Sequence, residues 1–409
     1  MNTRRRSGTC LAVAAVAVAT VAAGCGSSKP SAGGGGSKGA ITIGIITDET
    51  GPAAPGNRTC PEGVHAGAVE AAKSGYTIKY VVGDSQTSLT GVLNAAKRMV
   101  QQDHVLAVIS CSGLAFGATD YLHSVSMPVV GEAEDGPEWR TLDNMFSITG
   151  ALDFNAVSDG LGKFFKMQGV TVVGALGYGI SPSSSNAAKG AGVSAEASGL
   201  KVGYINSNFP YGSTNVEPDA LAMKAKGVDG VTSETDPNTS FALISALRQA
   251  GANIKAAVVP DGYGGDLTQA GPGAIAAGQD VFFTTQYQPV EMHTQATETF
   301  QADLRRIGIN GDPTFAEYNG YASVDLLVDA LKLVSGKVTQ ASLMTALNQV
   351  TGFDAWGLLG SHTITPSDRQ GTPIGPDGCG YYTRLSGTNF ELVPGADPLC
   401  GKLLPTRIG

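Results

Sequence analysis

The chain has 409 residues, of which 42% are hydrophobic and 15% are charged, so it can bury one or two cores of ordinary domain size. Its formal net charge is −8, and it becomes −11 without the three arginines of residues 1–24. This surplus of acid argues against nucleic acid and against an anionic membrane surface as electrostatic partners.

The N-terminus predicts a targeting segment rather than a folded part of the protein. Residues 4–6 are arginines, and residues 11–23 form an apolar run. That run is too short to cross a bilayer, since crossing takes roughly 20 residues. It ends in VAAGC, which resembles a lipobox, so we expect residues 1–24 to be a lipoprotein signal peptide.

The residue that follows the signal peptide is Cys25, and we expect it to carry the lipid. Ala22 departs from the leucine usual in a lipobox, so a plain secretory signal is the alternative. Residues 25–40 are rich in glycine and serine and predict a flexible linker. We therefore expect an exported protein that lipid anchors to the extracytoplasmic face of the cell membrane.

Four cysteines remain in the mature chain, at positions 60, 111, 379 and 400. An even number in an oxidising compartment predicts two disulfides, and four cysteines can pair in three ways. We favour Cys60–Cys111, because both lie at one edge of the predicted sheet, and Cys379–Cys400, because they are close in sequence. No cysteine or histidine spacing is typical of zinc sites, so we expect no metal.

Apolar runs that alternate with helical patterns dominate the chain. The first strands are expected at 41–47, 76–82, 105–109 and 128–131, with helices between them at 61–74 and 87–103. Such alternation predicts a parallel sheet with helices on both faces. After residue 148 a helix is expected at 153–168, and the alternation then begins again, with strands at 170–176, 200–206, 228–234, 254–260 and 281–287.

A single core of this total size is unusual, because cores stop growing at about 250–300 residues. We therefore expect an α/β protein of two doubly wound parallel-sheet lobes joined by a hinge. The tail 353–409 contains short strand candidates such as GYYTRL. Open parallel sheets hold ligands at the carboxyl ends of their strands, so a ligand is expected beside the loops after 105–109 and 128–131.

Several strings in this order resemble one family. They are ITIGIITDETGPAAPG, AAKRMVQQDHVLAVISCSG, DPNTSFALISALRQAG, VVPDGYGGDLTQAG and EYNGYASVDLLVDALK. From about residue 40 to about residue 360 the chain is similar to the type 1 periplasmic binding fold, in particular to the Leu/Ile/Val-type (branched-chain amino acid) solute-binding proteins of ABC importers. The resemblance implies three crossings between lobes, with lobe one formed by 41–150 plus 288–350 and lobe two by 151–287 plus 351–409.

The resemblance also implies ligand-binding residues in lobe one. Cys111-Ser112 matches a family pair that places a disulfide and a ligand-binding serine together, which supports the Cys60–Cys111 pairing. Ser112 and Gly113 precede a helix, so they could bind an anionic group such as a carboxylate. The alternative is a plain helix cap without a ligand.

The loop after the fourth strand departs from the family pattern. Where relatives have alanine and threonine, this chain has the acids Glu132, Glu134 and Asp135. Three acids would repel a ligand carboxylate, so an ordinary branched-chain amino acid is in doubt. Either these acids point to solvent, or they favour a cationic or polyhydroxyl ligand.

The facing lobe offers further candidates. Asp261 matches a family acid that holds a ligand ammonium group, with a plain turn aspartate as the alternative. Tyr178 follows the first strand of this lobe, where the family places a cleft-wall aromatic. Asp236 could reach the cleft, or it could cap a helix. Trp139 is expected to be an exposed loop aromatic that stacks on the ligand.

Catalytic patterns are weak throughout the sequence. Ser112 has no GxSxG frame, GALGYG lacks the GxGxxG order, and no Walker A or HExxH string occurs. We therefore expect no enzyme and no cofactor, but a lipoprotein that captures a small polar molecule by hinge closure and delivers it to ABC permease subunits. The alternative is a ligand-sensing surface receptor module with the same fold.

Overall fold

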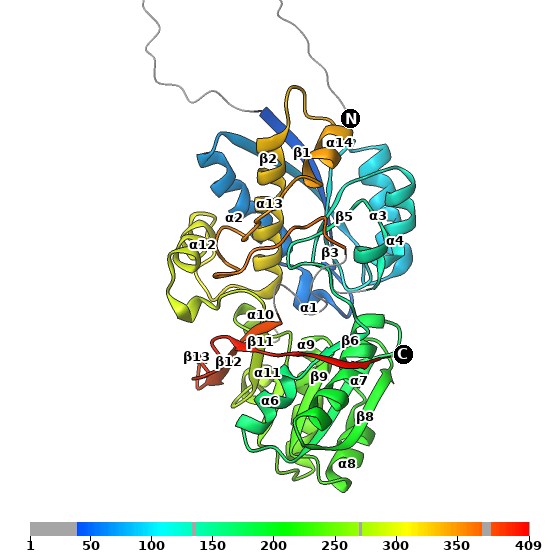
Figure 1. Ribbon diagram of the computed structural model, residues 1–409, viewed down its shortest axis with the longest axis vertical. Coiled ribbons are helices and arrows are strands. Elements are labelled where there is room, and N and C mark those ends of the chain that lie inside the picture. The colour runs from blue at the N-terminus through cyan, green and yellow to red at the C-terminus, as the bar shows by residue number, and fades with distance from the viewer. Residues whose placement is uncertain (1–38, 133–135, 270–271, 370–377, 409) are drawn as a thin grey trace, which may run out of the picture. The chain divides into compact units, whose positions relative to one another are not determined.

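The computed structural model describes residues 39–132, 136–269, 272–369 and 378–408 (Figure 1). The predicted signal peptide, Cys25 and nearly all of the linker lie outside these residues, as do Glu134 and Asp135, so their roles stay predictions. Within the described ranges, no helix is both long enough and apolar enough to cross a membrane.

The first sheet contains five strands in the order β2-β1-β3-β4-β5, and all of its pairings are parallel. Its strands are β1 (Gly39–Thr47), β2 (Tyr76–Asp84), β3 (Val108–Cys111), β4 (Val129–Gly131) and β5 (Met145–Ser147). The apolar strand expected at 41–47 is β1, and its Ile43 and Ile45 are completely buried. A near-continuous apolar run of this kind is typical of a strand covered on both faces.

Helices cover both faces of this sheet. They are α1 (Ala54–Asn57), α2 (Cys60–Lys73), α3 (Leu89–Gln101), α4 (Phe116–Ser124), α5 (Glu138–Thr141), α12 (Gln295–Arg306), α13 (Phe315–Leu333) and α14 (Gln340–Leu347). Helices α2 and α13 pack together on one side, and α3 and α4 pack together on the other (Figure 1). The first and last thirds of the chain therefore share one core.

Helices α2 and α13 touch at two glycines. A Cβ atom on Gly63 would lie 2.1 Å from the carbonyl oxygen of Glu317, and one on Gly320 would lie 2.3 Å from that of Cys60. Only glycine lets the two backbones approach this closely. Because α13 is buried along most of its length, its sequence is apolar or small on nearly every side.

The second sheet follows the order β13-β12-β11-β10-β9-β7-β8, with β14 beside β12. Its strands are β7 (Val172–Tyr178), β8 (Lys201–Phe209), β9 (Gly230–Glu234), β10 (Ala256–Val259), β11 (Phe282–Thr285), β12 (Cys379–Ser386), β13 (Asn389–Leu392) and β14 (Leu399–Cys400). Strands β7 to β11 pair in parallel, and the tail adds β12, β13 and β14 in antiparallel pairings. The expected strand GYYTRL is part of β12.

The helices of the second sheet are α6 (Gly160–Met167), α7 (Pro182–Ala197), α8 (Glu217–Ala225), α9 (Pro237–Gln249), α10 (Gly265–Gln269) and α11 (Pro272–Ala277). The short helix η1 (Val290–Met292) follows β11. The two largely parallel sheets, with helices packed on them, confirm the predicted α/β fold class.

The prediction of a helix at 153–168 is partly wrong. Strand β6 (Ala156–Ser158) occupies its start and pairs with β15 (Leu403–Arg407) from the end of the chain. Only α6 remains of the expected helix. A partner that lies some 250 residues away in sequence leaves no local periodic signal, and for this reason the strand was missed.

Both favoured disulfides are present. Cys60–Cys111 joins the start of α2 to the end of β3, and Cys379–Cys400 joins β12 to β14. Each bond restricts the unfolded chain, and the first also fixes a loop at the carboxyl edge of the first sheet.

The predicted division into lobes stays a prediction, and we propose one adjustment to it. The backbone N–H of Trp356 donates to Asp325 of α13 at 2.6 Å, and Arg369 donates to the carbonyl oxygens of Leu142 and Met145 beside β5. These partners belong to the first sheet and its helices. We therefore propose that residues 353–369 belong to lobe one, and that the chain joins lobe two only with β12.

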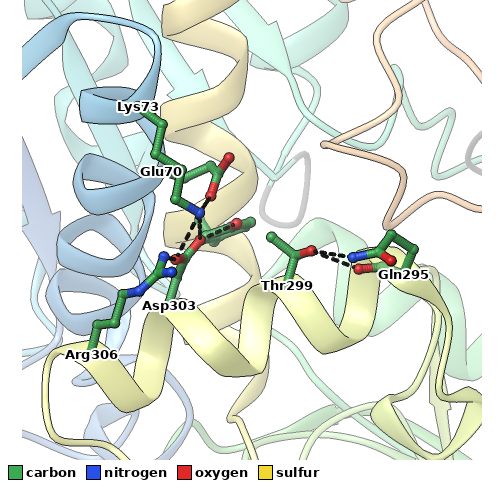
Figure 2. A network of polar contacts seen from close by, with 7 residues as sticks. Glu70, Lys73, Gln295, Thr299, Asp303 and Arg306 are labelled. Atoms are coloured by element: carbon green, nitrogen blue, oxygen red, sulfur yellow. Dashed lines mark hydrogen bonds and ion pairs between the residues drawn. The ribbon is translucent and has the colours of Figure 1, made fainter.

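A cluster of charges joins α2, α12 and α13 (Figure 2). Asp303 is fully buried and accepts hydrogen bonds from Lys73 at 3.2 Å, Arg306 at 2.5 Å and Tyr321 at 3.0 Å. Lys73 also pairs with Glu70. Burial alone would raise the pKa of Asp303, but a proton shared with the Glu70 carboxyl and the hydrogen bonds that Asp303 accepts from Lys73 and Tyr321 outweigh burial and lower that pKa.

Candidate functional site

A cavity of about 370 Å³ lies at the carboxyl ends of strands from both sheets. Residues that follow β1, β3 and β4 line it from the first sheet, and residues that follow β7, β8, β9, β10 and β11 line it from the second. Strand ends of parallel sheets are where α/β proteins hold ligands. A volume of this size suits a small molecule.

Asp48 lies directly after β1 and is fully buried behind the cavity. Its carboxylate accepts hydrogen bonds from Ser85, from the Ser112 hydroxyl at 2.7 Å, from the Gly113 N–H at 2.9 Å and from Asn57 at 3.0 Å. Burial raises the pKa of Asp48, although these hydrogen bonds oppose the rise. The donors that were expected to hold a ligand carboxylate therefore hold the protein's own acid.

Ser112 and Gly113 differ in their relation to the cavity. Gly113 lines it, whereas Ser112 is buried and is not a lining residue. The Ser112 hydroxyl also accepts from the Leu114 N–H at 3.3 Å, as a capping serine does. A Cβ atom on Gly113 would lie 2.7 Å from the hydroxyl oxygen of Tyr211, so a larger residue there would require the Tyr211 side chain to move.

The acidic loop after β4 contributes Glu132, which is buried and lines the cavity. Its neighbours Glu134 and Asp135 lie outside the described residues. For Glu132, therefore, the cavity-facing interpretation of the acidic loop holds. Trp139 was expected to be exposed and is not: it is 2% exposed, and its ring packs against Gly131 in the core between the first sheet and α3 and α4. An apolar ring of this size gains more from burial than from a place in a loop.

Three acids line the cavity from the second sheet. Glu234 ends β9, Asp236 follows it, and Asp261 follows β10. Asp236 accepts from the Thr239 N–H at 3.1 Å, so it caps α9, and it also accepts from the Tyr178 hydroxyl. It thus fulfils both roles that were weighed for it, helix cap and cavity wall.

Asp261 is partly exposed on the cavity wall and has no hydrogen bond or ion pair among the described residues. Burial raises the pKa of Asp261 to about 7, and the nearby charges of Asp236 and Glu234 add to the rise. Burial also raises the pKa of Glu234, whose carboxylate accepts from Thr232 at 2.5 Å. Asp261 and Glu234 therefore lie close enough to repel each other, and among the described residues neither acid forms an ion pair with a cation.

Aromatic rings form part of the same wall. Tyr178 lines the cavity as predicted, and its ring centroid lies 4.5 Å from that of Tyr211. Phe154 and Phe315 line the cavity as well. Phe315 begins α13, where Thr314 and Glu317 form a reciprocal capping box that fixes its position.

The cavity therefore brings together Gly113, Tyr178, Asp236 and Asp261 of the predicted ligand residues, and their contact with a ligand stays a prediction. The sequence analysis missed Asp48, Glu234 and Phe315. The first two directly follow or end parallel strands, and this position was the signal that selected Ser112. In the described part of the chain, no group of three or more His, Cys, Asp or Glu is arranged to hold a metal ion.

Residues 40–387 of the sequence match the periplasmic binding protein family. The chain belongs to this family. The match covers the first sheet, strands β7 to β12 of the second and the residues that line the cavity, and it confirms the resemblance seen in the sequence. No curated protein sequence matches this binding protein significantly.

Solved structures support the same fold for this periplasmic binding protein. A solute-binding protein of an ABC transporter from R. palustris, in complex with 4-hydroxybenzoate, is similar with a TM-score of 0.72 and 17% identity, covering 87% of this chain and 96% of that one. The branched-chain amino acid transporter substrate-binding protein LivJ from Streptococcus pneumoniae, in complex with isoleucine, has a TM-score of 0.70 and 18% identity, covering 87% and 99%. A possible leucine/isoleucine/valine-binding protein from Rhodopirellula baltica has a TM-score of 0.71 and 15% identity, covering 87% and 97%.

Proposed function

We propose that this protein is the extracytoplasmic solute receptor of an ABC importer and captures a small polar molecule in the cavity at the strand ends. The observation that carries the proposal is the cavity of about 370 Å³ lined by loops of both sheets, in a member of the periplasmic binding protein family. Structural neighbours described as ABC transporter solute-binding proteins support the transport context.

Capture would proceed by hinge closure. Ligand contacts come from both lobes, so a bound solute lowers the free energy of the conformation in which the two lobes approach. The connections between β5 and β6 and between β11 and η1 would act as hinges. The closed form would then be recognised by the permease subunits.

An N-terminal lipid anchor completes the proposal. The positively charged residues 4–6, the apolar run 11–23 and the VAAGC string support export and lipid attachment at Cys25. Residues 25–40 would act as a flexible tether that keeps the receptor near its permease without fixing its orientation.

The test of solute capture is a thermal-shift screen against amino acids, amines, aromatic acids and sugars. A compound that binds only the folded state raises the melting temperature by mass action. In the variant Ala187→Trp, an exposed residue of α7 that lines the cavity becomes bulky, and we expect the shift to disappear. Ala197→Trp enlarges an exposed residue of the same helix that is not among the lining residues, and it should leave the shift unchanged. A hit that survives Ala187→Trp would contradict this cavity as the site.

A further inference from the structure

We propose that the solute is an organic cation, an amine or a guanidine with an apolar part and without a carboxylate group. This inference rests on the proposed function, because it names the class of molecule that the same cavity takes. It is argued from the charge of the cavity wall, from the use of its hydrogen-bond donors and from its aromatic rings.

The charge of the wall has one sign. Among the described residues that line the cavity, the acids are Glu132, Glu234, Asp236 and Asp261, and Lys, Arg and His are absent. An anion would be repelled from this wall, and a zwitterion would gain at its ammonium group what it loses at its carboxylate. A cation alone gains from every one of these acids.

The donors that could hold a ligand carboxylate on the first sheet are already used. Asp48 accepts from the Ser112 hydroxyl at 2.7 Å and from the Gly113 N–H at 2.9 Å. Asn57 donates to Asp48 at 3.0 Å and to the carbonyl oxygen of Ala53 at 3.3 Å. A carboxylate ligand would therefore have to displace a fully buried acid of the protein.

The serines on the facing wall are also used within the chain. Ser181 accepts from the Ser184 N–H at 3.3 Å and lies 3.0 Å from the Ser183 hydroxyl. Ser184 donates to the carbonyl oxygen of Glu234 and accepts from the Tyr178 N–H at 2.7 Å. Ser181 caps α7 and Ser184 fixes the loop after β9, so a single O–H of the Ser181–Ser183 pair is the donor that these serines leave on this wall.

Acceptors, by contrast, remain. The Asp261 carboxylate has no hydrogen bond among the described residues, and the side-chain oxygen of Gln286, also a lining residue, is buried without a hydrogen-bond partner. Leaving the buried Gln286 oxygen unsatisfied is unfavourable, and a ligand rich in N–H donors would satisfy it and also pair with the partly exposed Asp261 carboxylate. The wall thus offers the hydrogen-bond acceptors that an ammonium or guanidinium group requires.

The rings beside these acids favour an organic cation. Tyr178 and Tyr211 pack against each other on the wall, and Phe154 and Phe315 add apolar surface. Aromatic faces attract cations, and they also cover an apolar ligand body. A cavity of about 370 Å³ has room for such a body.

The experiment compares three compounds on one frame by calorimetry at pH 8. They are 2-phenylethylamine, a cation, phenylalanine, which adds a carboxylate to it, and 3-phenylpropanoate, an anion. We expect the amine to bind at least about tenfold more tightly than either other compound, because only it lacks a negative charge. A second set, 1,5-diaminopentane, 5-aminopentanoate and glutarate, repeats the comparison on an aliphatic frame.

Substitutions test whether the acids of the cavity wall cause the tighter binding of the amine. Asp261→Asn and, independently, Glu234→Gln should each weaken binding of the amine by at least about tenfold, since each removes a charged partner in low dielectric. Asp329→Asn removes one negative charge from a partly exposed ion pair with Lys332 on α13, outside the cavity, and should leave the affinity unchanged. Equal weakening by all three variants would contradict a specific contact.

The outcomes separate this inference from the proposed function. Tighter binding of phenylalanine, 3-phenylpropanoate, isoleucine or 4-hydroxybenzoate than of any amine would overturn the cation proposal and leave solute capture intact. Failure of every compound of every charge class to bind would overturn both. Tightest binding by an amine, lost in Asp261→Asn, is the result that we expect.

Discussion

Two buried groups of acids in this protein are arranged in opposite ways. Asp303, between α12, α2 and α13, accepts from Lys73, Arg306 and Tyr321 (Figure 2). Asp261, on the cavity wall, has the acids Asp236, Glu234 and Asp266 as its ionisable neighbours. The pKa of Asp303 is lowered by its partners, despite burial, whereas the pKa of Asp261 is raised.

The difference separates acids whose hydrogen-bond donors and cations come from the chain from acids that lack such partners. A carboxylate that only stabilises the fold is surrounded by donors from the chain, as Asp303 is. A carboxylate crowded by other acids destabilises the fold when it is charged, and we propose that at Asp261 a bound molecule supplies the missing cation. The following substitutions and the change of pH test this contrast.

Asp303→Asn should have the largest effect on stability. The amide cannot accept from Lys73, Arg306 and Tyr321 together, and it leaves two cations beside a buried neutral group. We expect the free energy of unfolding to fall by about 2–3 kcal/mol, less than for a fully buried pair because Lys73 and Arg306 are half exposed. Urea unfolding measures it, and an unchanged midpoint would contradict the role of this cluster.

Asp261→Asn should change stability in the other direction. Without ligand at pH 8 it removes repulsion from Asp236 and Glu234, so we expect the folded state to gain about 2 kcal/mol, after allowance for partial solvent exposure. This corresponds to a melting temperature higher by roughly 4 °C. A lower melting temperature would show that the Asp261 carboxylate has a stabilising partner.

The melting temperature of the ligand-free protein should fall as the pH rises, because acids with raised pKa values become charged. Burial and neighbouring acids raise the pKa of Asp261 to about 7, and burial, with Glu62 nearby, raises that of Glu317 to about 8. The protonated acids favour the folded state, so their contribution is present at low pH and is lost as the pH rises through these values. We expect the ligand-free melting temperature to fall by a few degrees from pH 5.5 to pH 8.5.

A matched control isolates the source of this slope. In Asp261→Asn the fall should become smaller, because one of the titrating groups is gone. Asp303 contributes in another pH range, since the stability that comes from its lowered pKa is lost only below about pH 4. A melting temperature that rises from pH 5.5 to pH 8.5 would contradict the raised pKa values.

Much of the fold could be predicted from the sequence, because strand and helix periodicity is local. The strand 41–47, the two parallel-sheet lobes and both disulfides followed from pattern and order. Strand β6 could not be predicted, because its partner β15 is distant and its own three residues carry no period. The burial of Trp139 likewise depends on packing that no local pattern shows.

The site was predicted in part for a related reason. Asp261 and Tyr178 were inferred from the resemblance to the family, and Asp236 from its place after a strand. Which hydrogen-bond partner a side chain has depends on how distant loops come together in the fold, and the sequence does not show this. The donation of Ser112 to Asp48, across 64 positions, is such a case. The sequence had left both a ligand with a carboxylate and a cationic one open, and this hydrogen bond supports the proposal of a ligand without a carboxylate.

The most direct test is the affinity for 2-phenylethylamine at pH 6 and pH 8. The groups facing Asp261 are Asp236, Glu234 and the buried Asp266, all acids, so only an ionised Asp261 adds attraction for the ligand ammonium group. With a pKa of about 7, we expect binding to be about tenfold tighter at pH 8 in the wild type. In Asp261→Asn the affinity should be weaker and nearly independent of pH. Equal wild-type affinity at both pH values, or tighter binding at pH 6, would contradict the pairing of a cation with these acids.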